Sequence, residues 1–151
     1  MAETLTLHCG GIKDGKFILR CTGRGEDRSP AFRLEGLSEK AKTLAVTLED
    51  LSHPIKNFPH WVIWNLSAVA EIPGGIAAGR RLPSGAEQGV AYGFFRYAGP
   101  KPPRGKQHRY RFTVYVLDGK LSLGRLAGRG AFLKAAQNHI LQQGNIEGVF
   151  P

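Results

Sequence analysis

The stretch from Val46 to Leu66 constrains the fold of this chain more than any other part of its sequence. Two apolar runs of strand length flank a short loop that holds an acid, a hydroxyl group, imidazoles and prolines. Apolar strands are suited to burial, whereas Asp50 and His60 resist burial unless each has a partner. Polar groups at the ends of such strands indicate a concave site on a β scaffold.

The other apolar runs also predict strands. Short apolar or alternating segments, separated by turns rich in Gly and Pro, are typical of a β-rich fold. The predicted strands are Leu5–Cys9, Phe17–Leu19, Leu44–Leu48 and Phe112–Leu117, with shorter ones at Tyr92–Tyr97 and Val149–Phe150. Because strands do not alternate with helices along the chain, the pattern predicts a mainly β fold and not a Rossmann-type one.

One long helix is predicted, over Phe132–Gln142. The residues that recur with helical spacing are Phe132, Ala135, Ala136, His139 and Ile140. This face should pack on the β core, which leaves Lys134 and Gln137 in solvent. His139 is then a packed structural residue, and Gly144 is placed to end the helix.

Charge is unevenly distributed along the chain. The 151 residues suit one domain, 1–151, and carry a formal net charge of +9. Residues 51–151 hold thirteen Lys and Arg but only four Asp and Glu. A field of this sign raises the local concentration of anions such as phosphates, nucleic acid or an acidic membrane. A solvated basic face accounts for the same composition.

The two cysteines and the N-terminal residues indicate the cellular compartment in which the protein is expected. Cys9 and Cys21 have no zinc-ligand spacing, and two thiols in a chain of this size are expected to stay free. The first residues lack a basic region followed by a long apolar one, and no apolar run approaches membrane-spanning length. We therefore expect a cytoplasmic protein with no transmembrane segment.

Three titratable residues stand at the ends of predicted central strands: Asp50, His60 and His108. Neighbouring antiparallel strands could bring all three side chains to the mouth of one cavity, with Tyr110 nearby as a hydroxyl donor. A carboxylate that accepts from one imidazole nitrogen sets the tautomer of the ring and favours its cation. Such a group would form an anion cradle, which should bind phosphate more tightly as the pH falls from about 8 to about 6.

Several short motifs, in order and with consistent spacing, together resemble one known family. They are Ser29-Pro30, Val46–Pro54, His60-Trp61-Val62-Ile63-Trp64-Asn65, Gly99-Pro100 through His108-Arg109-Tyr110, and Phe112–Asp118. In these motifs the chain resembles the phosphatidylethanolamine-binding proteins, in the bacterial and archaeal branch of Raf-kinase-inhibitor-like proteins. The likeness spans most of the sequence.

The resemblance implies an antiparallel β-sandwich with small peripheral helices and a cis peptide bond before Pro54. It also implies non-catalytic binding of a phosphate-bearing anion or phosphorylated headgroup, by a kinase-inhibitor-like regulatory protein with a protein partner. A monomer or homodimer without cofactor, metal ligand or catalytic residue is expected. The implied ligand-binding residues are Asp50, His60, Gly99, Pro100, Pro103, His108 and Tyr110, with Gly99 and Pro100 shaping the wall.

The chain departs from the family pattern in the loop after Asp50. Ser52 stands where the family usually has a second Asp, and His53 stands where it has Ala, just before Pro54. The loss of a carboxylate removes the partner expected for a substrate ammonium group, and the added imidazole makes the mouth more cationic. These three residues are therefore expected to modulate ligand choice.

Three other functions remain open from the residues themselves. Ser52, His60 and Asp50 are the residue types of a hydrolase triad, although no Gly-x-Ser-x-Gly turn surrounds the serine. His53, His60, His108 and Asp50 could supply the nitrogen and oxygen ligands of a zinc enzyme. The basic second half could bind nucleic acid through stacked aromatic residues, but these lie among Val and Leu at strand period, so core packing is favoured and nucleic acid is unlikely.

Overall fold

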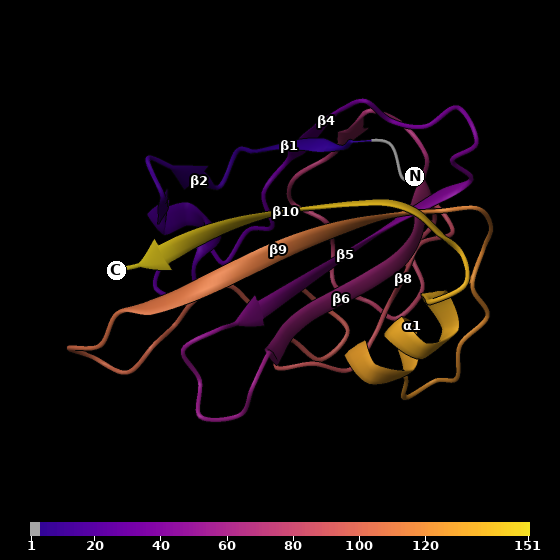
Figure 1. Cartoon of the computed structure of the whole chain (residues 1–151). Helices are drawn as coiled ribbons and strands as arrows, with labels where there is room; N and C mark the ends of the chain where they lie inside the picture. Colours follow the sequence, from indigo (N-terminus) through magenta and orange to yellow (C-terminus); the bar gives the residue numbers. More distant parts are fainter. Residues whose placement is uncertain (1–3) are drawn as a thin grey trace.

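The structure is a computed structural model that describes residues 4–151, and it contains two β-sheets packed face to face. The smaller sheet has the order β1 (Thr6–Cys9), β4 (Phe32–Glu35), β7 (Glu71–Ile72). The larger sheet has the order β2 (Ile12–Lys13), β3 (Lys16–Phe17), β10 (Ile140–Phe150), β9 (His108–Leu117), β5 (Thr43–Asp50), β6 (Phe58–Ser67), β8 (Glu87–Gln88). The predicted mainly β sandwich is confirmed. In Figure 1, β1 and β4 lie above the large sheet and α1 (Arg129–Ala136) lies below it.

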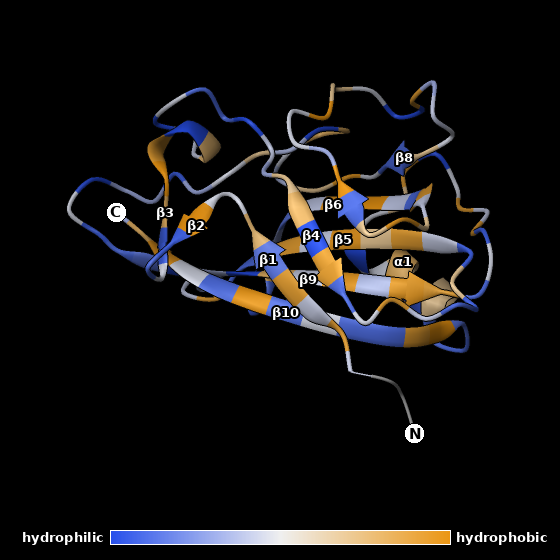
Figure 2. Ribbon diagram, turned by 90° about the horizontal axis from the view of Figure 1, so that it is seen from above, coloured by the Kyte–Doolittle hydropathy of each residue, from blue (hydrophilic) through white to orange (hydrophobic). Residues whose placement is uncertain are grey.

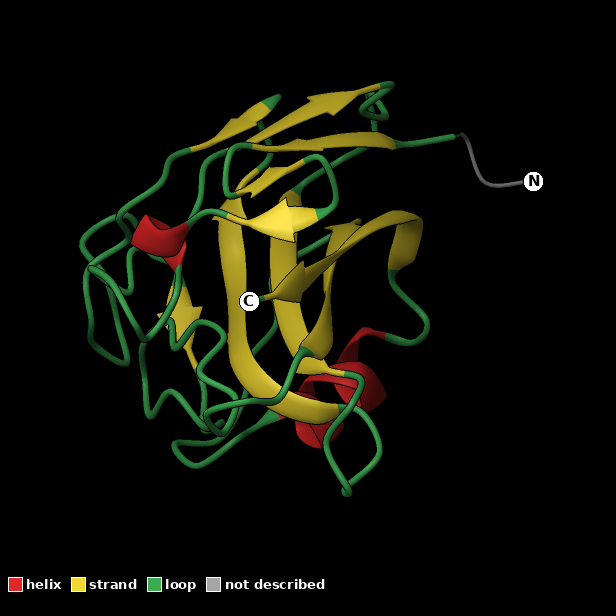
Figure 3. Cartoon of the chain, turned by 90° about the vertical axis from the view of Figure 1, so that its left-hand side faces the viewer, coloured by secondary structure: helices red, strands yellow, loops and turns green. Residues whose placement is uncertain are grey.

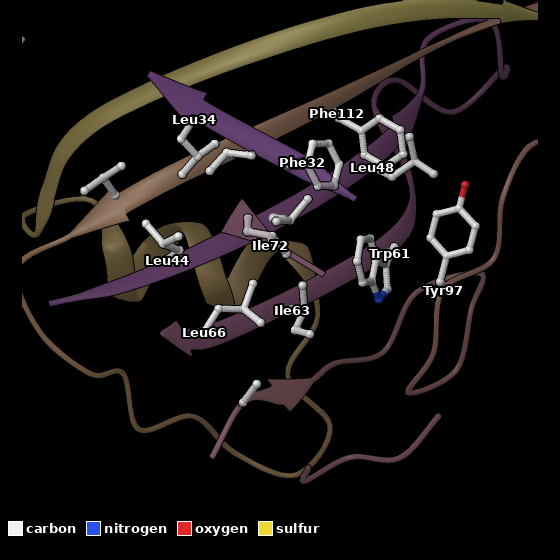
Figure 4. Packing of buried hydrophobic residues seen from close by; sticks show 14 of the residues in the cluster. Phe32, Leu34, Leu44, Leu48, Trp61, Ile63, Leu66, Ile72, Tyr97 and Phe112 are labelled. Carbon is white, nitrogen blue, oxygen red and sulfur yellow. The ribbon is translucent and has the colours of Figure 1, made fainter. Parts of the chain in front are cut away.

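The central strand β5 is buried along its whole length, because β9 and β6 pair with it on either side and both of its faces are covered. Its apolar residues Leu44 and Leu48 face the small sheet. Figure 4 shows Leu48 beside Phe32 of β4 and Phe112 of β9, with Leu44 farther along β5 in the same cluster. The Phe32 and Phe112 rings meet edge to face at 5.0 Å, a favourable aromatic geometry. Figure 2 shows apolar and polar residues alternating along β4, as expected for a strand that is buried on one face and exposed on the other.

The opposite face of the large sheet is covered by the helix. Phe132 and Ala136 of α1 are buried against Trp64 and Tyr115, and the rings of Tyr115 and Phe132 lie 5.3 Å apart. The Glu49 carboxylate is also buried on β5, and Arg129 at the start of α1 pairs with it at 3.0 Å. This ion pair ties the helix to the sheet.

The predicted extent of the helix, Phe132–Gln142, was wrong. The α-helix ends at Ala136, and the chain enters β10 at Ile140. From Ile140 onward the backbone pairs with β9 along the whole strand, and this non-local ladder overrides the local helical spacing. Gly144 lies inside β10, where a Cβ atom would approach the carbonyl oxygen of Leu5 to 2.9 Å. The final strand is therefore much longer than the predicted Val149–Phe150.

His139 was also misassigned as a packed residue. Its side chain is 49% exposed, and its Nδ1 lies 2.9 Å from a carboxylate oxygen of Asp118. It belongs to the turn between α1 and β10, where helical spacing no longer applies. Lys134 and Gln137 are exposed, as predicted.

Two further expectations differ from the structure. Tyr92–Tyr97 is a loop and not a strand, because Phe95 has a positive φ of 59° and interrupts an extended chain. Among residues 4–151 the one cis peptide bond joins Phe150 and Pro151, so the bond before Pro54 is trans.

The two cysteines are free thiols in the structure. Burial raises the pKa of Cys9 to about 12, and it also raises the pKa of Cys21. Within residues 4–151, no helix has the length and apolar character needed to cross a membrane.

Candidate functional site

A cavity of about 560 Å³ opens at the end of the large sheet where β5 ends and β6 and β9 begin. In Figure 1 these strand ends lie together on the left, and Figure 3 views the same end face-on, surrounded by loops. The residues that line the cavity are Asp50, Ser52, His53, Pro54, Phe58, His60, Tyr92, Lys101, Pro102, Pro103, Lys106, His108 and Tyr110.

Strand register brings the titratable residues together. Asp50, the last residue of β5, lies opposite Phe58 of β6 on one side and Tyr110 of β9 on the other. His60 is two residues beyond Phe58, and His108 is two residues before Tyr110. Three adjacent strands therefore place one carboxylate, two imidazoles and one phenol at the same cavity.

Asp50 and His108 form the most direct polar contact in the cavity. Nδ1 of His108 lies 2.7 Å from Oδ2 of Asp50, and the other carboxylate oxygen accepts the backbone N–H of Ser52 at 2.9 Å. An ionised carboxylate only accepts hydrogen bonds, so Nδ1 of His108 carries the proton. The pair is largely buried, with side chains 4% and 15% exposed. This contact orients the ring and leaves Nε2 of His108 as its second functional atom.

His60 is oriented by the backbone and not by a carboxylate. Its Nδ1 lies 3.0 Å from the carbonyl oxygen of Ala98, which can only accept, so Nδ1 is the donor. Burial lowers the pKa of His60 below its usual value, although the Ala98 carbonyl and the nearby Asp50 carboxylate oppose that shift. Desolvation therefore opposes the cationic form of His60, an effect that depends on burial in the folded chain.

Tyr110 carries a buried hydroxyl group with no hydrogen-bond partner among the described residues. The residue is 0% exposed, and it lines the cavity between His60 and His108. Burial raises the pKa of this phenol, and the Asp50 carboxylate adds to the rise, whereas the nearby backbone N–H of Lys101 opposes it. An N–H group can only donate to the phenol oxygen, so the hydroxyl stays protonated and its own proton is available to a ligand. Leaving such a group unpaired costs about 1–3 kcal/mol, which a ligand oxygen would recover.

Aromatic and basic residues surround the mouth of the cavity. His53 stacks on Phe58 with ring centroids 3.9 Å apart, and Tyr92 lies 6.2 Å from Phe58. Nδ1 of His53 accepts the backbone N–H of Ile55 at 3.0 Å, so Nε2 carries the proton in the neutral ring. Lys101 and Lys106 complete the lining, and Asp50 is its one acid among residues 4–151.

Sequence reasoning missed several lining residues: Phe58, Tyr92, Lys101, Pro102 and Lys106. The position of Phe58, two residues before His60 in a strand, could have indicated that both side chains face the cavity. Lys101 and Lys106 lie on either side of Pro102 and Pro103, within the motif from Gly99-Pro100 to Tyr110. Nothing in the sequence indicated Tyr92, which comes from the loop mistaken for a strand.

Gly99 and Pro100 do not line the cavity, contrary to expectation. The N–H of Gly99 donates to Asp27 at 2.7 Å, and the carbonyl of Pro100 accepts from Gly23 at 2.8 Å. A Cβ atom at Gly99 would clash with the carbonyl oxygen of Cys21. Through these contacts Gly99 and Pro100 connect the loop of residues 99–105 to the segment 23–27. Ser52, His53, Pro54 and Pro103 do line the cavity.

The contacts in the site argue against a hydrolase triad. Asp50 contacts His108 and not His60, and the Ser52 hydroxyl oxygen accepts the backbone N–H of Arg109 at 2.9 Å. The serine therefore has no imidazole base in hydrogen-bond contact, which a serine nucleophile needs. Nor do residues 4–151 contain a group of three or more His, Cys, Asp or Glu side chains placed to hold a metal ion.

Solved structures of similar proteins share this fold over nearly the whole chain. YbcL from Escherichia coli superposes with a TM-score of 0.83 and 27% sequence identity, covering 97% of each chain. A homologue of phosphatidylethanolamine-binding protein from Chlamydia trachomatis superposes with a TM-score of 0.82 and 26% identity, covering 98% of this chain and 97% of that one.

Sequence comparison finds relatives in archaea. A UPF0098 protein of Pyrococcus abyssi is 41% identical over 133 residues, which covers 85% of this chain and 75% of the relative. A UPF0098 protein of Archaeoglobus fulgidus is 36% identical over 152 residues, and this chain spans only about half of it, 52%. The family model described as phosphatidylethanolamine-binding protein matches residues 10–151. The chain therefore belongs to the phosphatidylethanolamine-binding protein family.

Proposed function

We propose that this protein binds, without catalysis, a phosphate-bearing anion in the cavity at the ends of β5, β6 and β9. The observation that carries the proposal is the unpartnered, buried Tyr110 hydroxyl beside the Asp50–His108 pair. A phosphoryl group offers several acceptor oxygens, which suit the phenol and Lys106 as donors. The imidazoles can donate to the same oxygens through Nε2 only in their protonated form, because Nδ1 of each ring is already bonded to Ala98 or Asp50. Pro103 provides an apolar wall beside these donors.

The chemistry of the mouth favours a phosphomonoester over a zwitterionic headgroup. Lys101 and Lys106 line the cavity, and among residues 4–151 no carboxylate besides Asp50 does so. Each oxygen of Asp50 already accepts one hydrogen bond, from His108 or from the Ser52 backbone, which leaves it a weaker partner for a ligand ammonium group than an unpaired acid would be. A ligand with excess negative charge and no cation matches this lining.

The biological role that fits such a site is regulatory. Family membership and the absence of a placed nucleophile in the cavity support a binding protein over a hydrolase. In this proposal the protein works in the cytoplasm as a kinase-inhibitor-like regulator. It presents its phosphorylated ligand to a protein partner or withholds the ligand from that partner.

The decisive variant is Tyr110→Phe, studied by calorimetric titration with inorganic phosphate and by urea unfolding. Because the hydroxyl has no partner among residues 4–151, its removal should leave the ligand-free stability unchanged or raise it by about 1 kcal/mol. Phosphate affinity should fall by about 1–2 kcal/mol, since one donor is lost. Tyr115→Phe is the matched control, because it removes the same group from a buried tyrosine that packs toward α1, outside the cavity, and it should keep the phosphate affinity.

Two results would refute the proposal. One is an unchanged phosphate affinity in Tyr110→Phe together with normal folding. The other is a wild-type protein that binds neither inorganic phosphate nor a phosphomonoester. Hydrolysis of a phosphate or carboxylate ester that disappears in Ser52→Ala would instead establish an enzyme.

A further inference from the structure

A second, smaller cavity of about 260 Å³ adjoins the first one. It is lined by Arg24, Pro102, Pro103, Arg104, Gly105, Lys106, Phe150 and Pro151. Pro102, Pro103 and Lys106 line both cavities, so the two share one wall. The second cavity thus begins where the candidate phosphate site ends.

The lining of the second cavity is basic. Arg24, Arg104 and Lys106 contribute to it, and among residues 4–151 no Asp or Glu side chain does. The oxygen of Pro151 at its edge accepts a hydrogen bond from the Gln107 side chain at 2.7 Å. Phe150 adds a half-buried apolar surface. Clustered guanidinium groups with an apolar floor suit a planar or tetrahedral anion.

The shared wall is held in a defined position. A guanidinium nitrogen of Arg24 donates to the carbonyl oxygen of Pro102 at 2.9 Å, and the N–H of Gly23 donates to Pro100 at 2.8 Å. Pro102 itself is buried, and the proline ring restricts its backbone. The two cavities therefore keep a fixed separation, as needed to recognise two groups of one molecule at once.

We propose that the second cavity binds a second anionic group of the same ligand, so that the physiological ligand carries a phosphoryl group and a further phosphoryl or carboxylate group. This inference rests on the proposed phosphate site. Tethering makes binding of the second group intramolecular, so affinity rises through effective concentration as well as through added charge contacts. A compact, singly phosphorylated molecule fills only the first cavity and binds more weakly.

The test compares inorganic phosphate, pyrophosphate and tripolyphosphate by calorimetric titration at constant ionic strength. Wild type should bind tripolyphosphate at least about tenfold more tightly than phosphate, because at least one charge-assisted contact is added. Arg104→Gln should lose most of that gain and keep its phosphate affinity within about twofold. Arg24→Gln should act in the same direction.

The matched control is Arg125→Gln, which removes the same charge from an exposed position in the loop between β9 and α1, outside both cavities. It should keep both affinities, because general electrostatic attraction is weak beyond a Debye length. Three results would overturn the inference: no gain with tripolyphosphate, an equal loss in Arg125→Gln, or an Arg104→Gln variant that retains the whole gain. A wild type that binds no phosphate at all would refute the proposed function instead.

Discussion

Asp50 and His108 lie 58 positions apart in the sequence, yet their side chains meet at 2.7 Å where β5 and β9 pair. The contact has two consequences. It places the proton of His108 on Nδ1, and it engages the one carboxylate that lines the cavity among residues 4–151. The contact therefore fixes the orientation of the imidazole ring.

Asp50→Asn should weaken binding of sulfate and phosphate by about 1.5–3 kcal/mol, although it removes a negative charge from a site proposed to bind anions. The amide presents a donor as readily as an acceptor, so it no longer fixes Nδ1 of His108 as the donor nitrogen and no longer orients the ring. Calorimetric titration at pH 6 measures the effect. Glu39→Gln, an exposed acid at the other end of β5, is the control and should change little. Tighter binding in Asp50→Asn would show that net charge outweighs orientation.

His60 should make the protein less stable under mildly acidic conditions. Burial lowers its folded-state pKa below the unfolded value of about 6.5, so the unfolded chain binds more protons between those two values. The His60 contribution to stability is therefore fully present above about pH 6.5 and declines as the pH falls toward the folded pKa. Urea unfolding without phosphate at pH 7.5 and 5.5 should show a smaller decline for His60→Gln than for wild type. His139→Gln, which removes an exposed imidazole, should decline as wild type does.

The same lowered pKa shifts the expected pH dependence of ligand binding. An anion beside His60 favours its cation, so binding should be accompanied by proton uptake and should continue to tighten below pH 6.5. Sulfate is the better probe, because it does not change charge in this range. Titrations in two buffers of different ionisation enthalpy should reveal the proton uptake, and His60→Gln should reduce it. Equal heats in both buffers would contradict this account.

Ser52→Asp should move ligand preference toward an amine headgroup. A carboxylate at this position can still accept the backbone N–H of Arg109, so the loop should be retained. It would add a charge-assisted partner for an ammonium group, worth roughly 1.5–3 kcal/mol. The ratio of phosphoethanolamine to phosphate affinity should rise accordingly. Ser122→Asp, with the same charge change at an exposed site outside the cavity, should leave the ratio as it is. An unchanged ratio in Ser52→Asp would mean that Ser52 does not set ligand choice.

Gly144→Ala and Gly130→Ala should have opposite effects on stability. A Cβ atom at Gly144 would lie 2.9 Å from the Leu5 carbonyl oxygen, so β10 and the chain before β1 must separate at a cost of about 1–3 kcal/mol. Gly130 is in α1 with no atom near such a Cβ, so alanine there should stabilise by about 0.5–1 kcal/mol. Thermal unfolding of both variants measures this. If Gly144 ended a helix, as its sequence context suggests, Gly144→Ala would not produce that clash.

Local sequence patterns were sufficient for the strands whose burial and propensity agree. Phe112–Leu117 and Leu44–Leu48 are apolar and rich in β-favouring residues, and both lie in the centre of the large sheet. The motifs that resemble the family also located Asp50, His60, His108 and Tyr110, because strand ends on neighbouring strands meet at one edge. The family assignment and the sandwich fold followed from the order of those motifs.

Non-local contacts determined the features of the fold and of the site that local sequence patterns did not predict. The segment after Ala136 has helical spacing, but pairing with β9 satisfies the whole backbone of β10 and outweighs a local preference worth tenths of a kcal/mol per residue. Gly99 and Pro100 support the site through Asp27 and Gly23, and Tyr92 reaches the mouth from a distant loop. The protonation behaviour of His60 and the free hydroxyl of Tyr110 depend on burial and on partners contributed by other segments. Residue types and their spacing along the chain indicated which side chains could form a site. Tertiary packing set which of them share a cavity and how burial shifts their protonation, because desolvation and hydrogen-bond pairing exist only once the chain has folded.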